Sequence, residues 1–240
     1  MSYARTVAGL SVFERARFTN RRQVAYNSVE GSKGDHKMSE QKKMGDMLKE
    51  FPYDPKTAPE TIFRLQKEFA GRFTPFKSLE NQDNPNTDDL YKYWIDEFVL
   101  CCEDELSEIL NWLPWKHWRS YQDFKFEETE LKFELIDLLH FYVNLCHVTG
   151  LDSSYLPHPR QDLWSTATLG EKFAATKKWM HRMYYRLVCL QMSPHSILGL
   201  IQLREALQNG FEIWDMTDQD VFNFYMSKYQ ENLDRQARGY

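Results

Sequence analysis

The 240-residue sequence predicts an all-α protein built as a helical bundle. Apolar residues recur at helical spacing through several long segments. No segment shows the period-two alternation, bounded by turn residues, that builds a sheet. Residues 59–240 are therefore predicted to form a single all-α domain, and residues 1–58 an irregular N-terminal extension.

The extension is polar and contains a Gly/Ser/Lys-rich stretch at residues 29–43 with little apolar periodicity. Three prolines between residues 52 and 59 then indicate a turn region. Thr61 is the predicted N-cap of a helix that begins near Ile62. Residues 73–89, rich in Asn, Asp and Pro, predict a loop.

Five further helices are predicted, with the approximate bounds 89–113, 127–149, 168–192, 194–209 and 217–236. Pro114 ends or kinks the first of them because proline cannot continue the hydrogen-bond ladder. Gly150 is a natural stop for the second. Ser193 and Thr217 are the predicted caps of the last two.

Composition excludes several classes of protein. The apolar runs are short and interrupted by charge, which predicts no membrane span, and the N-terminus does not resemble a secretory signal. The net charge of −5 divides unevenly: residues 1–50 carry ten Lys/Arg against six Asp/Glu, and the remainder carries twenty against twenty-nine. An acidic body argues against nucleic-acid binding.

The four cysteines form no CxxC pair, and two of them are adjacent in a predicted helix. We expect reduced, buried thiols in a cytoplasmic protein and no zinc site. Glycine-rich phosphate loops are absent from the sequence, which argues against kinase and dinucleotide-binding functions.

Two pairs of acids are the most informative chemical feature. Glu105 and Glu108 lie in one predicted helix, and Glu134 and Asp137 lie in the next. Side chains three residues apart lie on one helix face. If the helices pack side by side, four carboxylates converge, and such a cluster suits hard divalent cations. Composition alone supports a simpler interpretation equally well: the two segments are amphipathic helices with acidic outer faces.

The connector between these helices, NWLPWKHW, contains Trp112, Trp115 and Trp118 around Lys116. Aromatic rings near a metal site suit stacking on a base, and a lysine suits a phosphate. For Trp112 and Trp115 we favour packing at the turn between the helices.

The ExxE pair, the Trp/Lys connector and the following ExxD with His140 and Phe141 resemble the all-α nucleoside triphosphate pyrophosphohydrolases, which include MazG-like enzymes. The segments WKHW and DLLHFYVNL, and the ending YMSKYQENLDRQARGY, resemble the dimeric dUTPase branch in particular. The resemblance covers roughly residues 60–240 and is strongest over 97–150.

This resemblance implies magnesium-dependent hydrolysis of dUTP to dUMP and pyrophosphate by a homodimer, with metal-activated water attacking the α-phosphorus. It makes Glu105, Glu108, Glu134 and Asp137 the magnesium ligands, and we assign Glu108 as the general base. The resemblance also implies that Phe141 packs on the nucleoside, that Gln66 hydrogen-bonds the uracil edge, and that the phosphates are bound by Lys228, Asn232 and Arg235. From the chemistry of the connector, we expect Lys116 and Trp118 to contact the substrate.

The sequence departs from the family pattern at Phe69, where an asparagine is expected three residues after Gln66. Two alternatives therefore stay open. One is a pyrophosphohydrolase for another nucleotide, such as dCTP or a modified purine nucleotide. The other is a non-catalytic helical protein that binds a partner through its tryptophan-rich segment.

Overall fold

The structure, a computed structural model, describes residues 47–72, 87–116 and 124–238. The chain divides into two compact units, Met1–Lys43 and Met44–Tyr240, and every described residue belongs to the second. Its helices are α3 (Ala58–Ala70), α4 (Thr87–Asn111), α5 (Glu128–Thr149), the short 3-10 helix η3 (Ser153–Tyr155), α6 (Leu169–Met192), α7 (Ile197–Ile213) and α8 (Asp218–Ala237). No strand occurs in the three described ranges, so the predicted all-α class is confirmed.

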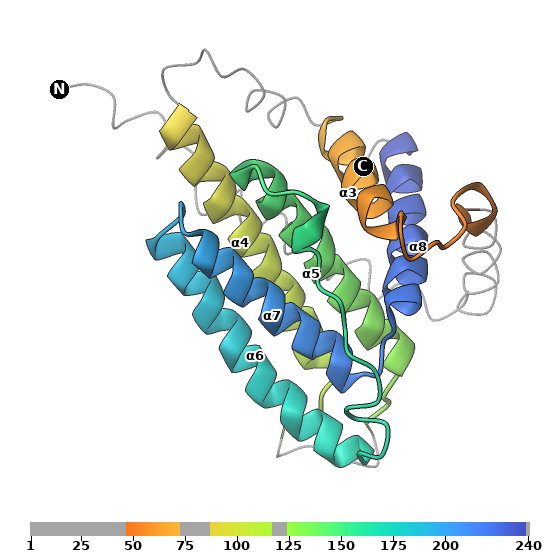
Figure 1. Ribbon diagram of the computed structural model, residues 1–240. Helices are drawn as coiled ribbons and strands as arrows, with labels where there is room; N and C mark the ends of the chain where they lie inside the picture. Colours follow the sequence, from red (N-terminus) through yellow and green to blue (C-terminus); the bar gives the residue numbers. More distant parts are fainter. Residues whose placement is uncertain (1–46, 73–86, 117–123, 239–240) are drawn as a thin grey trace. The chain divides into compact units, whose positions relative to one another are not determined.

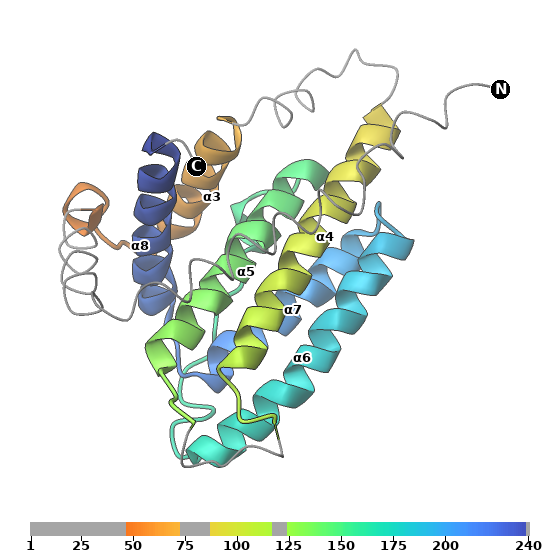
Figure 2. The same ribbon diagram turned by 180° about the vertical axis from the view of Figure 1, so that it is seen from behind.

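Helix α5 is the centre of this unit. It packs against α4 and α7 on one side and against α3 and α8 on the other, and α6 packs against α4 and α7 (Figure 1). The reverse view shows the same neighbours, with α4 and α5 running side by side (Figure 2). Two flanking groups of helices therefore meet across α5.

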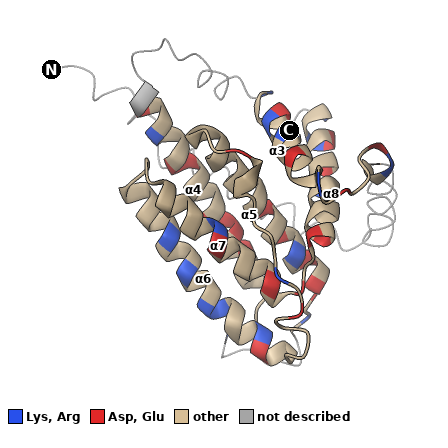
Figure 3. Ribbon diagram, in the orientation of Figure 1, with Lys and Arg blue, Asp and Glu red and all other residues tan. Residues whose placement is uncertain are grey.

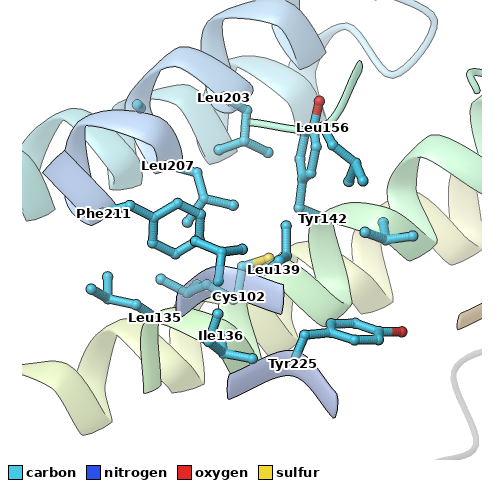
Figure 4. Packing of buried hydrophobic residues seen from close by; sticks show 14 of the residues in the cluster. Cys102, Leu135, Ile136, Leu139, Tyr142, Leu156, Leu203, Leu207, Phe211 and Tyr225 are labelled. Atoms are coloured by element: carbon cyan, nitrogen blue, oxygen red, sulfur yellow. The ribbon is translucent and has the colours of Figure 1, made fainter. Parts of the chain in front are cut away.

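The composition of α5 explains its place. Its buried residues recur on nearly every face rather than along one stripe, as expected for a helix covered all round. Leu135, Ile136, Leu139 and Tyr142 pack against side chains of α7 and α8, including Phe211 (Figure 4). Among its buried residues only His140 and Asn144 are polar, so each of them needs a specific explanation.

Several helix ends follow the sequence closely. Gly150 has φ of 72°, a left-handed conformation that glycine adopts without strain, and its N–H bonds the end of α5. Thr168 and Thr217 each form a reciprocal capping box, with Glu171 and Asp220. Pro114 follows the end of α4. The predicted cap at Thr217 is therefore confirmed.

Two predicted helix starts are wrong. Helix α3 begins at Ala58, and Thr61 lies inside it. Pro59, interpreted as a turn residue, occupies the first turn, where a missing N–H costs nothing. Helix α7 is capped by Ser196, whose side chain accepts from the N–H of Gly199; Ser193 instead follows the end of α6.

The described cysteines are free, with Cys102 and Cys146 buried and the other two half-buried. None of the described helices combines the length and apolar character that crossing a membrane needs. Residues 47–57, part of the predicted extension, are described and include a buried Met47. The predicted boundary at residue 58 stays a prediction.

Candidate active site

Three carboxylates meet where α4 and α5 run side by side. Oxygen atoms of Glu105, Glu108 and Glu134 all lie within 4.8 Å of one another, and Glu105 is only 5% exposed. Helix α4 itself carries eight Asp/Glu against one lysine, whereas Lys and Arg recur along α6 (Figure 3). Neighbours on α4 therefore add negative charge around the cluster, and compensating cations must come from another element or from solution.

Glu134 shows the electrostatic cost of this convergence. Burial raises its pKa to about 7, and the neighbouring Asp137 and Glu108 add to the effect. Lys228 lowers this pKa and partly offsets the rise, and so does the indole N–H of Trp112, which donates to Glu134 at 3.3 Å. A carboxylate that is half-protonated near neutrality loses its proton readily when a cation arrives.

Trp112 thus has a second role beyond the packing that we predicted for it. Its ring is half-buried against the core, and its N–H also fixes one acid of the cluster. The sequence indicates this role only through spacing: Trp112 follows Glu108 by four residues, about one helical turn, just past the end of α4.

Asp137, the fourth predicted acid, is held by a different partner. Lys228 Nζ of α8 lies 2.7 Å from its carboxylate, and both side chains are largely buried. Burial lowers the pKa of Lys228, but Asp137 and Glu231 outweigh burial and raise it above its ordinary value. Burial raises the pKa of Asp137, and Lys228 acts in the opposite direction. Lys228 therefore supplies a positive charge from the protein itself at the Asp137 side of the site.

Glu231 links the two predicted phosphate-binding cations. It lies 3.5 Å from Lys228 Nζ and forms an ion pair with Arg235 one turn later. Asn232, the third predicted phosphate contact, lies half-buried on the same helix, four residues after Lys228. The three predicted contacts are thus grouped on α8 beside α5.

Gln66, the predicted contact of the uracil edge, is buried and only 2% exposed. Its Nε2 donates to Asn144 Oδ1 at 2.9 Å, and its Oε1 lies 2.7 Å from His140 Nδ1 and 2.9 Å from the Tyr225 hydroxyl. These contacts join α3, α5 and α8 in one polar network.

The network fixes the protonation of His140. An amide oxygen only accepts, so Nδ1 carries the proton and donates to Gln66. Burial, assisted by Lys228, lowers the pKa of His140 to about 3, so the ring is neutral. Its Nε2 is then a buried acceptor with no hydrogen-bond partner among the described residues.

His140 and Asn144 are residues whose polar role the sequence analysis missed. His140 lies three residues after Asp137, and Asn144 four residues after His140; the other buried residues of this helix are all hydrophobic. The signal in the sequence is polar residues at helical spacing, and their burial in the structure is what requires hydrogen-bond partners.

The other predicted substrate-binding residues form fewer contacts with the site. Phe141 is half-buried, with its ring centroid 6.5 Å from that of Phe98. Lys116 is exposed and lies over the Trp115 ring, 5.1 Å from its centroid. Trp118 lies outside the described residues.

Comparison with known proteins assigns the family. A family model described as dUTPase matches residues 59–240, about three quarters of the chain. The chain belongs to the all-α dUTPase family. No curated protein and no solved structure matched the chain in the same comparisons.

Members of this family are nucleotide pyrophosphohydrolases that hydrolyse dUTP, and they are generally metal-dependent. The chain is therefore an enzyme of the dUTPase type, and the alternative of a non-catalytic interaction protein is set aside. Three converging carboxylates, one with its pKa raised to about 7, offer the oxygen ligands and negative charge that a hard divalent cation requires. The residues present fit a metal of this kind.

Proposed function

We propose that this dUTPase binds magnesium through Glu105, Glu108, Glu134 and Asp137 and cleaves dUTP between the α- and β-phosphorus atoms. The observation that carries the proposal is the convergence of three carboxylates on a volume less than 5 Å across. Bound magnesium would neutralise the triphosphate and lower the pKa of a coordinated water.

Glu108 is the proposed general base. It lies in the acid cluster, within reach of the same volume as Glu105 and Glu134. In this role it accepts the proton of the water that attacks the α-phosphorus. The bond to the bridging oxygen breaks, and pyrophosphate leaves with the electron pair of that bond.

Lys228, Asn232 and Arg235 are the proposed phosphate contacts. Lys228 already lies beside the acid cluster through its pair with Asp137, which supports this assignment. A lysine and an arginine stabilise charge that develops on a pyrophosphate leaving group. Phe141 and the exposed Lys116 are proposed to contact the nucleoside and the phosphates, respectively, and Trp118 stays a predicted contact.

Gln66 is the proposed reader of the base edge. Asn144, His140 and Tyr225 fix its amide orientation. Oε1 already accepts two hydrogen bonds and Nε2 donates one, so the second Nε2 hydrogen is left for an acceptor on the base. The family asparagine that is replaced by Phe69 leaves dCTP as the competing substrate to be tested. A rigid network of this kind supports selective binding of one base.

A panel of deoxynucleoside triphosphates tests the proposal. We expect pyrophosphate release from dUTP with magnesium, loss of release with EDTA, and at least tenfold lower kcat/KM for dCTP. In H₂¹⁸O the label should enter dUMP, because water attacks the α-phosphorus. Label in pyrophosphate would overturn the site of attack, a preference for dCTP would overturn the base, and activity in EDTA would overturn the metal.

The homodimer and the cytoplasmic location stay predictions. Five large apolar residues are exposed at the end of α6 and the start of α7: Tyr185, Val188, Met192, Ile197 and Leu198. A second copy covering this surface would remove that apolar area from water. Light scattering of wild type and Leu198→Glu tests this, with a dimer expected for wild type and a shift toward monomer for the variant; unchanged mass in the variant would exclude this surface.

A further inference from the structure

Glu231 is an acidic residue placed among the proposed phosphate-binding cations, and no step of the proposed reaction uses it. On α8 it lies three residues after Lys228 and four before Arg235, so all three side chains share one helix face. It forms ion pairs with both of them. Its side chain is 29% exposed, so it remains accessible to solvent.

The pairing neutralises both cations in the substrate-free enzyme. Lys228 lies between Asp137 and Glu231, and Arg235 is paired with Glu231. Although burial favours protonation of Glu231, Lys228 and Arg235 outweigh it and lower its pKa, so Glu231 is ionised at neutral pH. Two carboxylates and two cations therefore have a combined charge of zero.

A carboxylate and a phosphate compete for the same N–H donors of Lys228 and Arg235. Both bind lysine and arginine through charge-assisted hydrogen bonds to their oxygens. A phosphate group that reaches Lys228 and Arg235 must displace Glu231 from at least one of them, or bind beside its negative charge.

We infer that Glu231 is a built-in competitor of the substrate: its carboxylate holds Lys228 and Arg235 until a triphosphate replaces it, and it weakens the retention of pyrophosphate. The inference rests on the proposed phosphate-binding role of Lys228 and Arg235. Glu231 is thus a positioning residue, which keeps two like charges together on α8 and limits the affinity of the site for anions.

Glu231→Gln tests the inference because it keeps an acceptor oxygen and removes the charge. The four groups then carry a net charge of +1. We expect calorimetry with pyrophosphate and magnesium to show about three- to tenfold tighter binding, the size expected for one partly exposed ion pair. For dUTP hydrolysis, KM should fall by a similar factor without a rise in kcat.

Two variants serve as controls. Glu205→Gln removes the same charge from an exposed position on α7, and it should bind pyrophosphate like wild type. Glu231→Asp keeps the charge, and it should stay within about twofold of wild type, because affinity follows charge in a competition. A merely structural role would weaken binding in both Glu231 variants.

The outcomes separate the inference from the proposed function. Unchanged or weaker pyrophosphate binding in a folded Glu231→Gln variant overturns the competition. Lys228→Met should weaken pyrophosphate binding at least tenfold. If it does not, the phosphate-binding role of α8 is wrong. Weak binding in Lys228→Met together with no gain in Glu231→Gln would leave that role intact and reject only the inference.

Discussion

Glu134 and Asp137 lie one turn apart on α5 but are stabilised in opposite ways. Glu134 faces other carboxylates, accepts a hydrogen bond from Trp112, and has a pKa of about 7. Asp137 faces Lys228 at 2.7 Å and belongs to an ion-pair network on α8. The neighbours that raise the pKa of Glu134 are therefore carboxylates, whereas the hydrogen-bonded partner of Asp137 is a lysine.

This difference is consistent with the two roles proposed above for one surface of α5. The cluster gathers carboxylate oxygens, the ligands that the proposed magnesium ion would require. The network already contains the cations that an anionic ligand requires, with carboxylates in the place of phosphates. One metal-binding half and one phosphate-binding half of a nucleotide site would have these properties.

The largest expected effect is at the cluster. Glu108→Gln should lower kcat for dUTP by about 10³-fold, because the loss of a general base costs 10²- to 10⁴-fold. Steady-state kinetics with saturating magnesium measures it, with Glu205→Gln as the charge-matched control. Turnover near the wild-type rate in Glu108→Gln would exclude Glu108 both as the base and as an essential ligand.

The second prediction concerns a variant that removes the central cation of the ion-pair network on α8. Lys228→Met removes the partner of a largely buried carboxylate, which should destabilise the fold by about 3 kcal/mol at pH 7. Urea unfolding measures this loss. The loss should shrink at low pH, where Asp137 is protonated and no longer needs a cation.

A double variant, Lys228→Met with Asp137→Asn, checks the cause of that loss. It removes both charges, so it should recover most of the stability that Lys228→Met loses. A double variant as unstable as the single one would show that packing of the lysine stem, rather than the unpaired acid, dominates.

The third prediction concerns pH and the raised pKa of Glu134. Folding raises this pKa from 4.5 to about 7, so protonated Glu134 is favoured in the folded state. The corresponding stability is present below about pH 4.5 and is lost as pH rises to about 7, amounting to about 3 kcal/mol for a shift of this size. Metal-free enzyme should therefore lose stability from pH 5 to 8 relative to Glu134→Gln.

Magnesium should reverse this trend, because it binds the ionised acid. Thermal unfolding with and without magnesium should show a larger stabilisation at pH 8 than at pH 6. An equal magnesium effect at both pH values would exclude Glu134 from the metal site, while an unchanged metal-free pH profile in Glu134→Gln would assign the pH dependence to another group.

The sequence could predict local features but not the partners that tertiary packing supplies. Apolar periodicity predicted α4 and α5 to within two residues at each end, and spacing placed Glu105 with Glu108 on one helix face. The pair between Asp137 and Lys228 could not be predicted this way, because it depends on how α8 packs against α5, 91 residues further along the chain.

The same limit explains Gln66 and the start of α3. Gln66 reaches Asn144 across 78 residues, so its burial could not be inferred from its own helix. The start of α3 was missed for a local reason, since a proline favours both a turn and the first helical turn. Resemblance to a family supplied the proposed role of Gln66 but not its contacts.

The smallest expected effect concerns the polar network around Gln66. A variant of this network tests whether it serves recognition of the base or only packing. Tyr225→Phe removes a hydroxyl that reaches Gln66 Oε1 at 2.9 Å and the carbonyl of Ile62 at 3.2 Å. It should cost about 1 kcal/mol of stability, the net value of one hydrogen bond.

Since His140 still donates to Gln66, the fold should persist, but the amide should be held less firmly. The ratio of kcat/KM for dUTP to that for dCTP should then fall by about threefold, less than the loss expected from removing a direct base contact. Leu65→Val, which removes one buried methylene beside Gln66 on α3 and no polar atom, is the control for packing alone. Lower stability with an unchanged dUTP to dCTP ratio would make the network a packing device and move base reading to other residues.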